Sequence, residues 1–296
     1  MYDFNHNLKD IDFSDQDFEK ARTLIYSKAG INLTAAKRDM VYCRLLNRIK
    51  SYQFHSFREY LKLLDDPNHQ EWQEFVNALT TNLTSFFREQ YHFPILVDHI
   101  RKNCLRQRQI TIWCAAASTG EEPYSIAMSL IEGLQGLQHP PIFILATDID
   151  TNVLKVADAG VYSLDKTEKL SPEQVKRFFL KGTGNNEGFV KVRPEIKNLV
   201  RFRQVNLLDD LWNIRGPLDV IFCRNVMIYF DKKVQYAILK KLAPLLAPHG
   251  LLFAGHSESF HFANDLLSLV GRTVYQLADP EKIATKPQFN YESFFK

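Results

Sequence analysis

The chain has 296 residues, of which 45% are hydrophobic and 24% charged, a composition that excludes a disordered or low-complexity protein. Its 37 lysines and arginines barely exceed its 34 aspartates and glutamates, so the protein as a whole is not a polyanion binder. No apolar run approaches the roughly 18 residues of a membrane span, and the first residues lack a signal pattern. We therefore expect a cytoplasmic protein that does not insert into membranes.

Residues 14 to 90 have the periodicity of amphipathic helices. Phe18, Ala21 and Ile25 recur at helical spacing, and similar apolar repeats follow up to residue 64. Ser14 stands where a helix N-cap is expected, and Gly30 stands where that helix should end. The pattern predicts a small all-helical N-terminal domain over residues 1–90.

Basic residues are concentrated within this helical segment. Residues 34–50 contain five basic residues and one acidic residue. Lys37, Arg44 and Arg48 fall on one face of a predicted helix, away from its apolar stripe. Such a face is either solvated surface or a docking surface for an acidic partner. Nucleic acid is disfavoured because the net charge is small and no aromatic residues are interleaved with these three.

From about residue 110, short β-rich runs alternate with amphipathic helices. This alternation predicts an α/β domain over residues 91–296, with a doubly wound, Rossmann-like parallel sheet. Residues 160–195 interrupt the alternation: a glycine-rich stretch at 182–188 separates two apolar runs. The interruption predicts an inserted antiparallel β subdomain built on a hairpin.

Small residues and one acid follow the first two strands of the predicted sheet. Strand 110–114 leads into the turn 115–120, which has one glycine where a dinucleotide fingerprint has three. Asp148 ends the next strand and can accept both hydroxyls of a ribose, whereas Asp150 is better placed as a helix N-cap. This combination favours a nucleoside ligand without pyrophosphate, such as S-adenosylmethionine.

Six motifs, in the same order, make the sequence similar to a known family. They are Lys37-Arg-Asp-Met-Val-Tyr42, Thr80-Thr-Asn-Leu-Thr-Ser-Phe-Phe-Arg-Glu89, Ala115-Ala-Ala-Ser-Thr-Gly-Glu-Glu-Pro-Tyr-Ser-Ile126, Ala146-Thr-Asp-Ile-Asp150, Phe222-Cys-Arg-Asn-Val-Met-Ile-Tyr-Phe-Asp231 and Leu252-Phe-Ala-Gly-His-Ser-Glu258. From about residue 18 to 277 the sequence resembles the CheR family of chemotaxis receptor methyltransferases. The resemblance implies an S-adenosylmethionine-dependent methyltransferase domain and a helical N-terminal domain.

The resemblance also implies roles for individual residues. The cofactor-binding residues would be Asn82, Thr84, Arg88, Glu122, Asp148, Asn206, Leu207, Arg224 and Asn225. Arg88 and Tyr229 would face the transferring methyl group as catalytic residues. Taken alone, Arg88 would more often form an ion pair, for instance with Glu89, and Tyr229 would more often be core. Only the assembled motifs favour the catalytic interpretation.

Two surfaces would bind the receptor. Its helices would dock on the basic residues Lys37, Arg38, Arg44 and Arg48. The inserted hairpin resembles that of family members that bind a receptor-tail pentapeptide of the Asn-Trp-Glu-Thr-Phe type, here through Lys181, Gly182, Gly184 and Arg193. The alternative is a hairpin that only stabilises its domain. A monomer is expected.

The leading hypothesis is transfer of a methyl group from S-adenosylmethionine to glutamate side chains of chemotaxis receptors. The alternatives are a catalytically idle module that binds the cofactor or its product S-adenosylhomocysteine, and a methyltransferase for another substrate on the same fold. His256, Ser257 and Glu258 are consecutive and cannot form a catalytic triad. The histidines and cysteines lack ligand spacing, so no metal site is expected.

Overall fold

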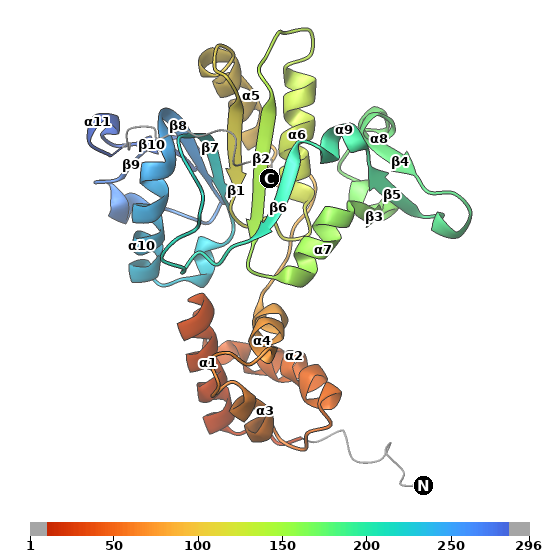
Figure 1. Cartoon of the computed structure of the whole chain (residues 1–296), viewed down its shortest axis with the longest axis vertical. Coiled ribbons are helices and arrows are strands. Elements are labelled where there is room, and N and C mark those ends of the chain that lie inside the picture. The colour runs from red at the N-terminus through yellow and green to blue at the C-terminus, as the bar shows by residue number, and fades with distance from the viewer. Residues whose placement is uncertain (1–10, 284–296) are drawn as a thin grey trace.

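The computed structural model describes residues 11–283, in which a small helical domain lies at the carboxyl edge of a larger α/β domain (Figure 1). The helical domain contains α1 (Asp15–Ala29), α2 (Arg38–Ser51), α3 (Phe57–Leu63) and α4 (Glu71–Leu79). None of the helices between residues 11 and 283 is both long and apolar enough to cross a membrane.

Helix α1 begins and ends where the sequence predicts. The Ser14 hydroxyl accepts from the Asp17 N–H, and the Asp17 carboxylate accepts from the Ser14 N–H, which forms a capping box. Gly30 ends the helix with a φ of 69°, a conformation that costs glycine little. The apolar faces of α1 to α4 share one core that includes Ile25, Leu45 and Phe75. The all-helical prediction is confirmed.

The basic residues of α2 do not form the open face that the sequence predicts. Arg48 donates to both carboxylate oxygens of Glu71, at 2.7 and 2.6 Å, and the Glu71 side chain is almost fully buried. The Tyr60 and Tyr52 hydroxyls donate to the same carboxylate at 2.8 and 2.9 Å. Arg48 therefore holds α2 against α4, and its charge is paired within the domain.

Arg38 and Arg44 are likewise half-buried and bonded within the domain. Arg38 binds the Asp15 carboxylate at 2.7 Å and lies over the Phe13 ring. Arg44 donates to the carbonyl oxygens of Ala78 and Thr80, just after α4. The family resemblance implies a docking role for both residues, but here their guanidinium groups are bonded to carbonyl and carboxylate oxygens of the same domain. Only Lys37 of the four remains exposed.

The α/β domain is built on a seven-stranded sheet in the order β6-β2-β1-β7-β8-β10-β9. The strands are β1 (Ile110–Cys114), β2 (Ile142–Asp148), β6 (Val200–Gln204), β7 (Leu218–Cys223), β8 (Leu246–Ala254), β9 (Leu267–Gly271) and β10 (Val274–Leu277). The five strands from β6 to β8 are parallel, as predicted. Strand β10 runs antiparallel to both of its neighbours, β8 and β9. A tight turn joins β9 to β10, and such a turn reverses the chain.

Alternate residues of the central strands face two separate cores. Ile112 and Phe222 face the core that is covered by α5 (His92–Asn103) and α6 (Glu121–Gly133). Trp113 and Ile221 face the opposite core, which is covered by α10 (Lys232–Leu242). Helices on both faces explain why these strands are continuously apolar rather than alternating. The doubly wound α/β class is confirmed.

The inserted subdomain follows α7 (Thr151–Ala159) and extends to the right in Figure 1. It contains β3 (Val161–Ser163), α8 (Pro172–Phe178), β4 (Phe179–Lys181), β5 (Phe189–Val192) and α9 (Pro194–Lys197). The strand order β3-β5-β4 is antiparallel, and the predicted hairpin is β4–β5. Helix α11 (Pro280–Ile283) and the 3-10 turns η1 (Ala35–Lys37), η2 (Leu164–Thr167), η3 (Gly184–Asn186), η4 (Met227–Tyr229), η5 (Ala243–Leu245) and η6 (His261–Ala263) complete the described chain.

The buried Glu71 predicts how the helical domain responds to mutation and to pH. Replacing Glu71 with Gln should lower the free energy of unfolding by on the order of 3 kcal/mol, because it leaves Arg48 without its charge partner. Burial alone would raise the pKa of Glu71, but hydrogen bonds from Arg48, Tyr60 and Tyr52 hold it below 4.5. The ionised Glu71 therefore stabilises the folded domain fully above the ordinary carboxyl pKa. This contribution is lost as pH falls through the folded-state pKa of Glu71.

Urea denaturation of wild type and Glu71→Gln at neutral and acidic pH measures this difference. Glu74→Gln is the matched control, since Glu74 lies 3.9 Å from Arg48 and is 37% exposed, and it should cost less than about 1 kcal/mol. Equal losses in the two variants would contradict the assignment of Glu71 as the partner that holds Arg48.

Candidate functional site

A cavity of about 460 Å³ lies where the carboxyl ends of β1, β2, β6 and β7 meet the helical domain. Parallel strands end at the same edge of a sheet, so the residues that follow them converge there. All the predicted cofactor-binding and catalytic residues line this cavity: Asn82, Thr84, Arg88, Glu122, Asp148, Asn206, Leu207, Arg224, Asn225 and Tyr229. Lys37 lines it as well, from the helical side.

Asp148 closes one wall of the cavity at the end of β2. Its carboxylate accepts from the Ser118 N–H at 2.8 Å and from the Asp150 N–H at 3.0 Å, and the residue is 8% exposed. Burial raises the pKa of Asp148 to about 6, although the two N–H groups oppose the shift. Hydrogen-bond donors from a ligand would favour its ionised form further.

Asp150 joins the helical domain to this wall. Its carboxylate accepts from the Asn152 and Val153 N–H groups and so caps α7, as the sequence predicts. It also accepts from the Thr80 hydroxyl at 2.7 Å and the Asn82 amide at 2.8 Å. The segment after α4 is thereby fixed over the cavity, with the Asn82 amide directed to Asp150.

Glu122 lies in the first turn of α6, the helix that follows β1, and lines the same cavity as Leu207. It accepts from the Cys114 thiol at 3.2 Å and pairs with Arg224. Burial raises the pKa of Glu122 above its ordinary value, although Arg224 opposes the shift. Gly120 precedes the helix with a φ of 97°, and a Cβ there would meet Ala157 at 2.9 Å. The glycine is therefore needed to bring this turn against α7.

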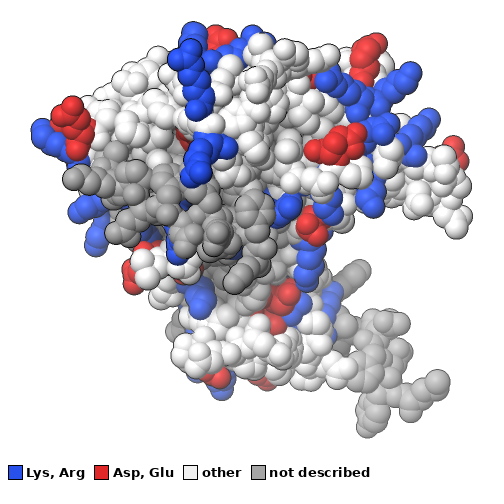
Figure 2. All heavy atoms as spheres, turned by 45° about the horizontal axis from the view of Figure 1, so that its top comes forward, with Lys and Arg blue, Asp and Glu red and all other residues white. Residues whose placement is uncertain are grey.

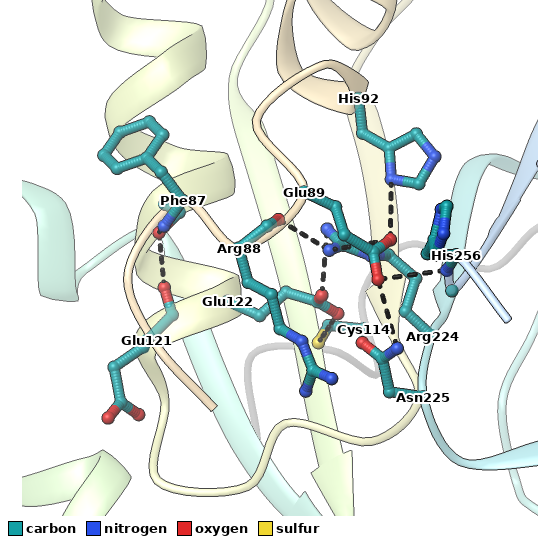
Figure 3. A network of polar contacts seen from close by, with 12 residues as sticks. Phe87, Arg88, Glu89, His92, Cys114, Glu121, Glu122, Arg224, Asn225 and His256 are labelled. Atoms are coloured by element: carbon teal, nitrogen blue, oxygen red, sulfur yellow. Dashed lines mark hydrogen bonds and ion pairs between the residues drawn. The ribbon is translucent and has the colours of Figure 1, made fainter. Parts of the chain in front are cut away.

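A buried guanidinium connects the walls of the cavity (Figure 3). The Arg224 side chain is 0% exposed and follows β7. Its Nη2 donates to the Arg88 carbonyl oxygen at 2.6 Å and lies 3.3 Å from the Glu89 carboxylate. Its Nη1 lies 3.2 Å from the Glu122 carboxylate. One cation thus joins the segment after α4, the start of α6 and the end of β7.

Glu89 is the second centre of this network. Its carboxylate accepts from the Asn225 amide at 3.1 Å and from the His256 N–H at 3.0 Å. Burial alone would raise the pKa of Glu89, but the His256 N–H and the Arg224 guanidinium lower it. Behind it, the buried His92 lies 3.7 Å away, and burial lowers the pKa of His92 to about 4. The site therefore contains an ionised Glu89 beside a neutral imidazole.

Glu258 holds the loop that follows β7. It accepts from the Asn225 and Met227 N–H groups at 2.9 and 2.8 Å, and from the Gly255 N–H. Asn225 has a φ of 57°, and a Cβ at Gly255 would collide with its amide. These contacts give Glu258 a structural role, which agrees with the rejection of a triad at residues 256–258.

The structure contradicts the simpler interpretations of Arg88 and Tyr229. Glu89 pairs with Arg224, while the Arg88 guanidinium points away from Glu89 and donates to the Leu83 carbonyl oxygen at 2.8 Å (Figure 3). Tyr229 is half-buried at the cavity rather than in the core. Asn206 and Leu207 follow β6, and the Asn206 amide donates to the Lys28 carbonyl oxygen at 2.8 Å.

Sequence reasoning missed Glu89, Ser118 and Glu258 as parts of the site. Glu89 and Glu258 stand inside two of the quoted motifs, but each acts on groups more than thirty residues away in sequence. Ser118 contributes its backbone N–H, and a side-chain motif carries no signal for that contact. Their roles depend on tertiary contacts that spacing does not reveal.

The histidines and cysteines lack ligand spacing in the sequence, but three of them come together in the folded chain. His99, Cys104 and His249 each place one possible ligand atom within 4.8 Å of the others. Spacing rules missed the group because His249 comes from β8, far in sequence from the other two. This cluster lies at the opposite end of the sheet from the cavity.

The residues of the cavity fit S-adenosylmethionine. Two acids, Asp148 and Glu122, suit a ribose diol and a cationic amino-acid end, and apolar side chains such as Ile149 and Leu207 suit a flat adenine. Arg224 supplies a buried positive charge at the same end as Glu122. The cavity thus offers both apolar and charged surfaces in the places that a nucleoside joined to an amino acid requires.

Comparisons with known proteins agree with this geometry. Residues 16–80 match the family model described as the all-alpha domain of the CheR methyltransferases, and residues 82–276 match their SAM binding domain. The chain is 52% identical to a chemotaxis protein methyltransferase of Salmonella typhimurium, over 90% of this chain and 91% of that protein. It is also 52% identical to chemotaxis protein methyltransferase 2 of Pseudomonas aeruginosa, over 90% and 94%, and 50% identical to that of Escherichia coli, over 90% and 92%. The chain therefore belongs to the CheR family of S-adenosylmethionine-dependent methyltransferases.

Proposed function

We propose that this protein transfers a methyl group from S-adenosylmethionine to glutamate side chains of chemotaxis receptors. The observation that carries the proposal is the single cavity that gathers Asp148, Glu122 and Arg224 on its walls with Arg88 and Tyr229. The names of its relatives, chemotaxis protein methyltransferases at 50% identity or more, support the receptor as the substrate.

In this proposal the cofactor is bound by groups at or after the carboxyl ends of four strands, β1, β2, β6 and β7. Asp148 accepts the ribose hydroxyls, and Asn206 and Leu207 flank the adenine. Glu122, Arg224 and Asn225 bind the amino-acid end, while Asn82, Thr84 and Arg88 cover the ligand from the segment after α4. The bound cofactor supplies an activated methyl group, and the protein supplies placement.

The acceptor needs little chemical activation. A glutamate side chain has a reference pKa of about 4.3, so it is already a nucleophilic carboxylate at neutral pH and needs no general base. Arg88 holds one oxygen of that carboxylate by a charge-assisted bond while the other oxygen faces the methyl group. The Tyr229 hydroxyl aims the same carboxylate. Catalysis then follows mainly from proximity and orientation.

The receptor-docking surface in this proposal is smaller than the sequence predicts. Lys37 is exposed and lines the cavity, so it is positioned to attract an acidic receptor helix. Leu83 and Ile228 line the same cavity and are 79% and 51% exposed, which offers apolar contacts beside the charge. Arg38, Arg44 and Arg48 are bonded within the helical domain, which favours Lys37 for this role.

The inserted subdomain is the proposed site for a receptor-tail pentapeptide. Strand β5 is already paired on both sides, so an added strand must pair with an edge strand such as β4. Gly182 donates to the Phe189 carbonyl oxygen and Arg193 to that of Phe178. The backbone N–H and C=O groups of successive residues in a strand point alternately to its two sides. Gly182 bonds toward β5, so the N–H and C=O of Lys181 point to the free edge of β4.

The contacts of the hairpin change two details of the predicted peptide site. The space beside Gly182 is filled by the Asn186 carbonyl of the same loop, so this glycine serves the turn. Arg193 donates to the Lys176 carbonyl oxygen at 3.4 Å. Gly184 has open space beside it. Lysine and arginine side chains gather on the side of the molecule where the subdomain lies, which suits a peptide that ends in a carboxylate (Figure 2).

The role of Asp148 predicts a pH-dependent affinity for S-adenosylhomocysteine. The ribose hydroxyls bind the ionised carboxylate, so affinity should be highest above the free-protein pKa of about 6 and should fall as pH drops through it. Asp148→Asn should lose on the order of 1.5–3 kcal/mol of binding and show a flatter pH profile. Calorimetric titration measures both, with the exposed Asp158→Asn as control. A wild-type affinity that does not change around pH 6 would remove Asp148 from the ribose site.

The role of Arg88 predicts a loss of turnover without a loss of folding. Arg88→Ala should lower kcat by about 100-fold, because the acceptor carboxylate is no longer oriented. Tyr229→Phe should lower it less and leave S-adenosylhomocysteine affinity unchanged. The assay follows labelled methyl groups onto receptor cytoplasmic fragments, with base-labile release confirming an ester. A thermal melt that collapses in step with activity would instead make Arg88 structural.

The edge of β4 predicts a matched pair of peptide-binding variants. Lys181→Pro removes the outward N–H, whereas Lys181→Ala keeps it and removes only the side chain. Fluorescence anisotropy with a labelled Asn-Trp-Glu-Thr-Phe peptide should show binding lost in Lys181→Pro and largely kept in Lys181→Ala. Equal binding by both variants, or no saturable binding by the wild type, would contradict strand addition at this edge.

A further inference from the structure

A cluster of metal-ligating side chains lies at the amino ends of the central strands, far from the cofactor cavity. His99 is in the last part of α5, Cys104 caps the end of the same helix, and His249 lies in β8. Asp219, near the start of β7, lies beside them. In Figure 1 this end of α5, β7 and β8 is at the top, and the helical domain is at the bottom.

The distances within the cluster are close to those between the ligands of one metal ion. Cys104 Sγ lies 3.9 Å from His249 Nε2, and Asp219 Oδ1 lies 3.2 Å from the same nitrogen. Tetrahedral zinc, with bonds of about 2.3 Å to sulfur and about 2.0 Å to nitrogen or oxygen, separates such pairs by roughly 3.6 and 3.3 Å. The measured separations therefore require movements of only a few tenths of an ångström for these two pairs.

His99 provides an independent sign that the cluster lacks a ligand. The residue is 7% exposed, and its Nε2 is buried without a hydrogen-bond partner. A buried imidazole nitrogen without a partner is costly, and a metal ion satisfies it. Its other nitrogen, Nδ1, lies 3.1 Å from the Asn103 side-chain amide. The same amide nitrogen also donates to the His99 carbonyl oxygen at 3.1 Å and so holds the side chain of Asn103 against this turn of α5.

We propose that His99, Cys104 and His249 bind one zinc-like divalent metal ion, with the Asp219 carboxylate beside His249 and outside this group of three. One thiolate with two imidazole ligands is a donor set that suits zinc. Binding displaces the thiol proton of Cys104 to solvent, so the metal exchanges with one proton at the sulfur. The ion joins the end of α5 to β8 and stabilises the end of the sheet opposite the cofactor cavity.

Cobalt titration of the chelator-treated full-length protein tests the site. Wild type should take up one equivalent of Co²⁺ with a sulfur-to-cobalt charge-transfer band, and Zn²⁺ should abolish the band by displacement. Cys104→Ser should lack the band. His249→Ala, at a side chain that is 35% exposed, should fold and bind more than about tenfold more weakly. Cys43→Ser is the matched control, because Cys43 is an exposed thiol outside the cluster.

A second measurement follows stability instead of spectra. Zn²⁺ should raise the melting temperature of wild type and Cys43→Ser, but not that of His249→Ala. Affinity for S-adenosylhomocysteine should be the same with and without the metal, so a failed metal site and a failed cofactor site are distinguishable. A charge-transfer band that persists in Cys104→Ser, or no band in folded wild type, would overturn the proposal.

Discussion

The buried positive charge of Arg224 is the constraint on which the cofactor cavity depends. A guanidinium that is fully removed from solvent must be paired, because an isolated buried charge costs several kcal/mol. Glu89 and Glu122 meet that need from two segments that are far apart in sequence, and the Arg88 carbonyl adds a third contact. The position of one side chain therefore determines how the segment after α4 meets the start of α6 and the end of β7.

The local backbone shows the same constraint. Phe87 and Glu89 have φ values of 50° and 54°, and Asn225 has a φ of 57°, a region that ordinary residues seldom adopt. Such conformations persist when surrounding contacts over-determine them. Glu89 bonded to Asn225, and Glu258 bonded to the Asn225 N–H, supply those contacts. Of these three residues with positive φ, Asn225 lines the cavity, and Arg88, between Phe87 and Glu89, lines it as well.

The helical domain contributes to the site through a seam of polar contacts. Asp150 caps α7 and binds Thr80 and Asn82, while the Asn32 N–H donates to the Tyr229 carbonyl oxygen at 2.8 Å. Arg44 of α2 supports these contacts from inside the helical domain, because it donates to the carbonyl oxygens of Ala78 and Thr80. A change in the helical domain can therefore alter the cofactor wall without touching the cofactor.

The sequence by itself determined the local elements. The capping residues Ser14 and Asp150, the apolar runs of the strands and the small-residue turn before α6 act over a few residues, so pattern alone predicts them. The cofactor-binding residues that the family resemblance implies line one cavity, because parallel strands bring their carboxyl ends to one edge. Only the tertiary structure decided the partners of the charges. A sequence cannot tell whether Arg48 faces water or Glu71, or that His249 lies beside Cys104, because pairing of charges and ligands depends on which distant segments the cores bring together.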